Sequence, residues 1–85
     1  MSRDTESAVE LVRVIAKALV DLPDEVEVEA VDASRRCVIQ LSVDPSDLGR
    51  VIGKKGRNAR SVRVLLGAMG VQRRRRYALE ILETD

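Results

Sequence analysis

The residues with the clearest chemical capability form a short turn, Gly53-Lys54-Lys55-Gly56. Glycine adopts positive φ and carries no Cβ, so a phosphate backbone can approach the peptide closely at such a turn. The sequence predicts a helix beginning at Arg57, whose first N–H groups and positive dipole end would point at the same spot. Together with the two lysine charges, these features predict a phosphate clamp.

Three side chains in the first turn after this loop are candidate further contacts. Arg57 and Arg60 bring positive charge to a place where the helix dipole already favours anions. Asn58 can hydrogen-bond either a phosphate or a base edge, and the sequence does not decide between them. The chain has one aromatic residue, Tyr77. We therefore expect charge, rather than base stacking, to supply the affinity for a nucleic acid.

The charges are strongly segregated along the chain. The net charge is only +1, but residues 48–76 contain ten Lys and Arg and no Asp or Glu. Residues 1–47 contain eleven acidic and five basic residues. A segregated basic half is typical of proteins that bind a polyanion. The run at 73–76, four arginines, should lie at the far end of the domain from the glycine loop, where it extends an RNA path, binds a partner or is simply solvated.

Composition argues against most enzyme classes. The chain has no histidine and a single cysteine, so it lacks the commonest general base, an internal disulfide and a multi-cysteine metal site. We expect no enzyme activity, no cofactor and no small-molecule substrate, and Cys37 is expected in the core. The N-terminal residues show no secretory signal and no apolar run could span a membrane, so a cytoplasmic protein is expected. Its 85 residues allow one domain, 1–85.

Hydrophobic spacing predicts three helices and three strands. Thr5 to Leu22 reads as a helix, capped by Asp4 or Thr5 and ended by Pro23. A second helix is predicted from Asp44 to Ile52, with Asp44 as its cap and Asp47 as a weak capping-box acid. A third is predicted from Arg57 to Met69, and Gly70 is its expected stop. The helical stripes comprise Val9, Val12, Ile15, Ala16 and Leu19, and then Val62, Leu65, Leu66 and Met69.

Three segments alternate as half-buried strands do. They cover residues 26–31, 36–43 and 77–82, with a hairpin connection at 32–35 between the first two. Their predicted inward residues are Val26, Val28, Ala30, Cys37, Ile39, Leu41, Val43, Tyr77, Leu79 and Ile81. The order α-β-β-α-α-β, with one apolar face per strand, predicts a two-layer α+β domain with a three-stranded mixed sheet and three helices on one face. The second and third strands should be parallel.

At this point the chain resembles a KH domain. Residues 51–56 match the Val-Ile-Gly-x-x-Gly signature of that family, and the element order matches its type II topology. The stand-alone length and the segment 47–57 are similar to the small single-KH-domain RNA-binding proteins of the KhpA family. One residue departs from the usual pattern, because Ala59 stands where KH domains often carry Ile, so base preference cannot be carried over.

The resemblance implies a probable RNA chaperone or post-transcriptional regulator that binds single-stranded RNA through the loop and an adjacent groove. It also implies pairing, as a homodimer or with a second, KhpB-like KH protein. The expected RNA-binding residues are Arg50, Val51, Ile52, Gly53, Lys54, Lys55, Gly56, Arg57, Asn58 and Arg60.

Two alternatives stay open on the residues alone. The helix pair around the glycine loop has the local form of a helix–turn–helix DNA reader, with Arg57, Arg60 and Arg63 on one helix face. The chain could instead be a protein–protein module, because the outer sheet face mixes Val31 and Leu82 with glutamates. A preference for single-stranded RNA over duplex DNA would distinguish RNA binding from the helix–turn–helix alternative. Measuring the size of the protein with and without RNA would distinguish it from the protein–protein module.

Overall fold

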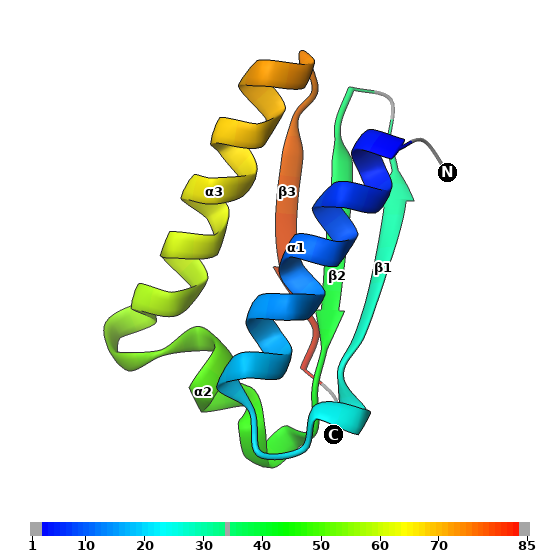
Figure 1. The fold of residues 1–85 in the computed structure, drawn as a ribbon. Helices are drawn as coiled ribbons and strands as arrows, with labels where there is room; N and C mark the ends of the chain where they lie inside the picture. Colours follow the sequence, from blue (N-terminus) through cyan, green and yellow to red (C-terminus); the bar gives the residue numbers. More distant parts are fainter. Residues whose placement is uncertain (1–2, 34, 84–85) are drawn as a thin grey trace.

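The computed structural model describes residues 3–33 and 35–83. Over these residues the elements follow the predicted order (Figure 1). The helices are α1 (Arg3–Leu19), α2 (Leu48–Ile52) and α3 (Arg57–Arg73), and the strands are β1 (Glu27–Asp32), β2 (Cys37–Ser42) and β3 (Tyr77–Ile81). Short 3₁₀ turns occur at Pro23–Glu25, Pro45–Asp47 and Lys54–Gly56.

The sheet has the mixed topology that the sequence predicts. β2 lies in the centre, antiparallel to β1 and parallel to β3. Ile39 shows both pairings, because it lies opposite Ala30 of β1 and Leu79 of β3. The parallel pair follows from the crossover through α2 and α3. The predicted 32–35 connection does join an antiparallel pair, although Ser34 lies outside the described residues.

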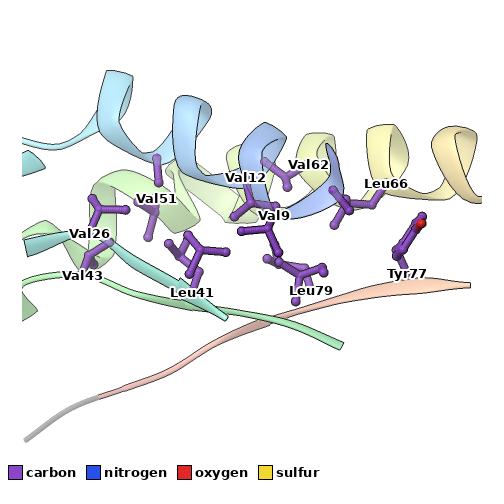
Figure 2. Close-up of a cluster of buried hydrophobic side chains, with 14 of the residues drawn as sticks. Val9, Val12, Val26, Leu41, Val43, Val51, Val62, Leu66, Tyr77 and Leu79 are labelled. Atoms are coloured by element: carbon purple, nitrogen blue, oxygen red, sulfur yellow. The ribbon is translucent and has the colours of Figure 1, made fainter. Parts of the chain in front are cut away.

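The helices form one layer over one face of the sheet (Figure 1). α1 packs on β1 and β2, whereas α3 packs on β3, and Figure 2 shows the apolar side chains enclosed between the two layers. Cys37 is fully buried in this core, as predicted, and burial and the nearby Asp32 raise the pKa of its thiol. No helix in the described ranges has the length and apolar content needed to cross a bilayer.

The first helix differs from its prediction at both ends. It spans Arg3–Leu19 rather than 5–22, so Asp4 and Thr5 lie inside the helix and the predicted cap is wrong. The Asp4 carboxylate instead pairs with Arg73 of α3, with 2.9 Å between the charged atoms. Thr5 is only 2% exposed, so it packs in the interior rather than capping a helix end.

Asp47 explains the early end of α1, and its assignment as a capping-box acid is wrong. Its carboxylate is 1% exposed and accepts the backbone N–H groups of Asp21 at 3.1 Å and Leu22 at 3.0 Å. These two amides therefore cannot continue the helical i→i−4 pattern. Asp44 does cap the following turn, as predicted, because its side chain accepts the N–H of Ser46 at 3.0 Å. Hydrogen bonds from Ser46 also lower the pKa of Asp44.

The end of α3 is a second correction, because the helix continues through Gly70 to Arg73. The residue after it, Arg74, adopts the left-handed conformation with φ of 54°. The N–H of Arg75 then bonds the carbonyl of Gly70 at 2.8 Å, closing a Schellman motif. Gly70 serves this turn by its missing side chain, since a Cβ there would lie 2.2 Å from the carbonyl oxygen of Arg75.

One predicted core residue of α3 lies outside the core. Leu65 is 48% exposed, because the buried face runs through Ala59, Val62, Leu66 and Gly70. These residues are spaced by three and four and define the helix face toward the sheet. Leu65 lies to one side of that face, at the edge of the contact. The other expected core positions are buried or half-buried, and Ala59 belongs to the buried row.

Candidate functional site

The glycine loop joins α2 to α3 through a four-residue turn in which three residues have positive φ. Gly53 has φ of 79°, Lys55 of 58° and Gly56 of 75°. The N–H of Gly56 bonds the carbonyl of Gly53 at 3.0 Å, which closes the turn. The side chains of Lys54 and Lys55 are exposed. The turn thus holds both lysines outward while its backbone stays accessible.

The two glycines of the loop are required for different reasons. A Cβ at Gly53 would lie 2.7 Å from Asn58 Cγ and 2.8 Å from the Asn58 nitrogen, so the loop packs directly on the first turn of α3. A Cβ at Gly56 would meet nothing within 4 Å, so this glycine is needed only for its positive φ. The open space beside Gly56 leaves room for a bulky anion at the start of α3.

The N-terminus of α3 is built as an anion-favouring end. Gly56 is its N-cap residue and no side chain in the described part of the chain caps it. The positive end of the α3 dipole therefore faces the loop, and Arg57 and Arg60 are exposed beside it. Lys54, Lys55, Arg57 and Arg60 form no ion pair with any residue of the described ranges. Their charge is available to an external polyanion.

Two of the expected contact residues instead brace the loop. The Asn58 side-chain N–H donates to the backbone carbonyl of Arg50 at 2.7 Å, which ties α3 to α2 across the turn. The guanidinium of Arg50 bonds Asp21 at 2.8 Å and Asp47 at 3.2 Å. Val51 is 3% exposed and packs in the core below the loop. Sequence spacing gave no signal of this network, because its partners Asp21 and Asp47 lie 26 residues apart.

A groove beside the loop runs between α3 and β3. It encloses about 530 Å³ and is lined by Ile52, Gly56, Ala59, Arg60, Arg63 and Ile81. Ala59 is 4% exposed and forms part of the floor. The Arg63 guanidinium reaches across to donate to the carbonyl of Leu79 at 3.5 Å. Arg63 and Ile81 were not among the expected site residues, because only the packing of α3 against β3 brings them beside the loop.

The groove offers aliphatic walls and cationic rims, which suit a sugar–phosphate backbone whose bases lie against apolar side chains. In the described part of the chain no group of three or more acidic or cysteine side chains is placed to hold a metal ion. The arrangement presents hydrogen-bond donors and fixed positive charges beside an apolar surface.

A family model described as "KhpA/KhpB, KH domain" matches residues 9–81. Three similar curated proteins are each named RNA-binding protein KhpA. That of Borreliella burgdorferi is 43% identical, covering 88% of this chain and 92% of its own length. Those of Caldanaerobacter subterraneus and Aquifex aeolicus are both 47% identical, covering 86% and 87% of this chain and 97% and 94% of their own lengths.

A solved structure shares the fold. The crystal structure of Aquifex aeolicus Era superposes with a TM-score of 0.62 at 24% identity. The match covers 91% of this chain but only 30% of the Era chain, so the two share one domain's architecture. At this level of identity the likeness concerns the fold alone.

Proposed function

The chain belongs to the KhpA/KhpB KH-domain family, and from that premise we propose that it binds single-stranded RNA at the glycine loop and the adjoining α3–β3 groove. The observation that carries the proposal is the exposed Lys54-Lys55 turn set against an uncapped α3 N-terminus. The relatives are named as RNA-binding proteins, and the chain is a binding module rather than an enzyme. We further propose that the domain spans 1–85 and that it acts as an RNA chaperone or post-transcriptional regulator in the cytoplasm.

The proposed contacts divide by role. Lys54, Lys55, Arg57 and Arg60 neutralise phosphates, and the backbone between Gly53 and Gly56 admits the RNA closely. Ile52 provides an apolar wall for a base. Arg50, Val51 and Asn58 hold the loop in place from behind. This division rests on which side chains are exposed and unpaired and which are buried or hydrogen-bonded within the domain.

The decisive test reverses the charge of the loop. In Lys54→Asp/Lys55→Asp two carboxylates would face phosphate at a helix N-terminus, so we expect RNA binding to be lost. Both side chains are exposed and aspartate tolerates the positive φ of Lys55, so the free energy of unfolding should change by no more than about 0.5 kcal/mol. Fluorescence anisotropy with a short labelled RNA and thermal unfolding measure the two quantities. A folded double variant that binds RNA as well as wild type would refute the proposed site.

Duplex DNA serves as the competitor in the same assay. The helix–turn–helix alternative predicts that duplex DNA binds more tightly than single-stranded RNA, whereas a groove between a helix and a strand edge favours a single strand. A preference for duplex DNA in the wild-type protein would contradict the RNA proposal even if the charge-reversal variant lost all binding.

A second candidate function is pairing with another KH domain, either a copy of this chain or a KhpB-like protein. The observation in its favour is an exposed apolar stripe on α3, where Val64 is 66% and Leu65 48% exposed and Ala68 is also exposed. Val64 lies one helical turn from Arg60 of the groove, so pairing through the stripe would place the partner beside the bound RNA. Light scattering of wild type and Val64→Asp should show a dimer that the substitution disrupts. A wild-type monomer at all concentrations would exclude self-pairing.

A further inference from the structure

A second hollow lies at the opposite end of α3, where the chain turns back into β3. It encloses about 530 Å³, and its walls include Arg36, Arg74, Arg76, Gly67, Val71 and Ala78. We propose that this hollow is a second RNA site, which binds a further stretch of the single strand held at the glycine loop. The proposal rests on the proposed function and extends it by naming the surface that the RNA contacts beyond the glycine loop.

The charges of the arginine run separate into two sets. Arg73 pairs with Asp4 and Arg75 with Asp32, each at 2.9 Å, so these two guanidinium groups tie the domain together. Arg74 and Arg76 are exposed and make no ion pair within the described ranges, and Arg36, the residue just before β2, joins them. Three unpaired guanidinium groups around one hollow favour an external phosphate, which arginine recognises with paired hydrogen bonds.

The backbone of Arg74 supports a ligand-binding role. Its φ of 54° places it in the left-handed region, where helices usually end with glycine. A non-glycine residue in this conformation costs on the order of 1 kcal/mol. The helix C-terminal dipole attracts a positive charge but does not require it at this residue, because Arg73 already supplies one. The strained position holds an exposed guanidinium at the rim of the hollow.

The wall of the hollow is open because α3 lacks a side chain at Gly67. A Cβ there would meet nothing within 4 Å, so the fold itself does not demand glycine. Glycine in a helix interior nevertheless costs about 1 kcal/mol relative to alanine. Beside it Val71 is 82% exposed, which offers an apolar surface to a base or ribose. Shape and apolar surface thus accompany the charge, as a nucleotide site requires.

The two hollows are the ends of one track. Arg60, Arg63, Gly67 and Val71 recur at spacings of three and four, so they lie along one side of α3, and Gly56 and Arg74 flank the helix at its two ends. β3 forms the facing wall, with Ile81 in the loop-end hollow and Ala78 in the far one. In Figure 1 the α2–α3 loop and the turn from α3 into β3 lie at opposite ends of this pair. α3 has 17 residues, so the track is about 25 Å long.

Affinity as a function of RNA length tests the second site. A KH loop clamps about four nucleotides, so an RNA of that length occupies the loop end alone, whereas one of about twelve nucleotides can reach both ends. We would measure Kd for random-sequence RNAs of both lengths by fluorescence anisotropy. In the variant Arg74→Gly/Arg76→Ala the longer RNA should bind about ten-fold more weakly than to wild type, and the shorter RNA unchanged, because simultaneous contact at two sites is lost.

Two further variants make the comparison specific. The quantity compared is the Kd of the shorter RNA divided by the Kd of the longer RNA. Arg13→Ala/Lys17→Ala removes the same charge from α1, outside the track, and should leave this ratio at its wild-type value. Gly67→Leu fills the hollow without removing charge, and it should lower the ratio as Arg74→Gly/Arg76→Ala does. The longer RNA offers more binding registers in every variant equally, so the change in ratio is the informative quantity.

Each outcome has a distinct meaning. A wild-type ratio in both Arg74→Gly/Arg76→Ala and Gly67→Leu overturns the second site while leaving the loop site intact. Failure of wild type to bind either RNA overturns both proposals. If a labelled oligoglutamate peptide binds wild type more tightly than the longer RNA and loses that affinity in Arg74→Gly/Arg76→Ala, the hollow recognises an acidic protein segment and the RNA proposal for it is wrong.

Discussion

The side chains around the glycine loop have two roles, binding phosphate and positioning the loop, which their residue types alone do not distinguish. Arg60 is exposed and has no ion pair in the described part of the protein, whereas the side-chain N–H of Asn58 donates a hydrogen bond to the carbonyl of Arg50. Both are polar residues in the same helical turn. The contact with the Arg50 carbonyl makes Asn58 a positioning residue for the loop, whereas the free guanidinium of Arg60 is the proposed ligand of phosphate.

This difference predicts that two alanine substitutions both weaken RNA binding but that only one of them destabilises the fold. Arg60→Ala should weaken RNA binding by roughly 1 kcal/mol, about five-fold in Kd, with no change in melting temperature. Asn58→Ala should lower the free energy of unfolding by about 1 kcal/mol, because the Arg50 carbonyl loses its partner, and should weaken binding through the displaced loop.

Thermal unfolding and anisotropy on the same samples separate the two effects. If Asn58→Ala kept the wild-type melting temperature and bound RNA as weakly as Arg60→Ala, Asn58 would be a direct RNA contact. The positioning role would then be wrong.

At the scale of elements, α3 carries two glycines with opposite structural demands. A Cβ at Gly67 meets open space, but one at Gly70 meets the carbonyl oxygen of Arg75 at 2.2 Å. Gly67→Ala should therefore raise stability by about 1 kcal/mol, or roughly 4–8 °C in melting temperature. Gly70→Ala should lower stability, because the Schellman turn into β3 must shift. Differential scanning calorimetry of both variants checks the pair, and equal effects would contradict the described path of residues 70–77.

Local patterns predicted those elements whose signal lies within a few residues. The alternation of Cys37, Ile39 and Leu41 identified β2 and its buried face, and the paired glycines identified the turn between α2 and α3. The end of α1 could not be predicted, because it depends on Asp47, whose carboxylate accepts hydrogen bonds from amides 26 and 25 residues away in sequence. The end of α3 was missed because it places Arg74 in a conformation that sequence preferences reserve for glycine.

The candidate site divides in the same way. The loop and the first turn of α3 are contiguous in sequence, so their charges and glycines were visible as a motif. The facing wall of the groove belongs to β3, and only the fold brings Ile81 opposite Arg60. A residue's availability is also set by the fold, since Val51 is buried and Arg50 is held by two aspartates.

For the whole molecule, the separation of charge along the chain becomes a separation of surfaces. The basic residues 48–76 form α2, the loop, α3 and its exit, whereas the exposed glutamates Glu27, Glu29 and Glu80 lie on the sheet. A polyanion is therefore drawn to the α3 side and repelled from the open sheet face.

This arrangement predicts a marked salt dependence. If a short RNA contacts about three phosphates at the loop, the logarithm of the association constant should fall against the logarithm of salt concentration with a slope of about −2. Anisotropy titrations from low to near-physiological salt give the slope. A flat response would mean that apolar contacts in the groove, and not phosphate neutralisation, supply the affinity.

The bond from Arg63 to the Leu79 carbonyl has a consequence for association between folded copies of the chain. β3 is an edge strand, and the parallel pairing with β2 leaves the Leu79 carbonyl on its outer side. Unpaired edges recruit strands from other molecules and so begin fibrils. By reaching over from α3 to occupy this acceptor, Arg63 guards the edge with a charged side chain. We therefore expect loss of the Arg63 side chain to uncover this edge of the sheet as well as to remove a rim charge from the groove.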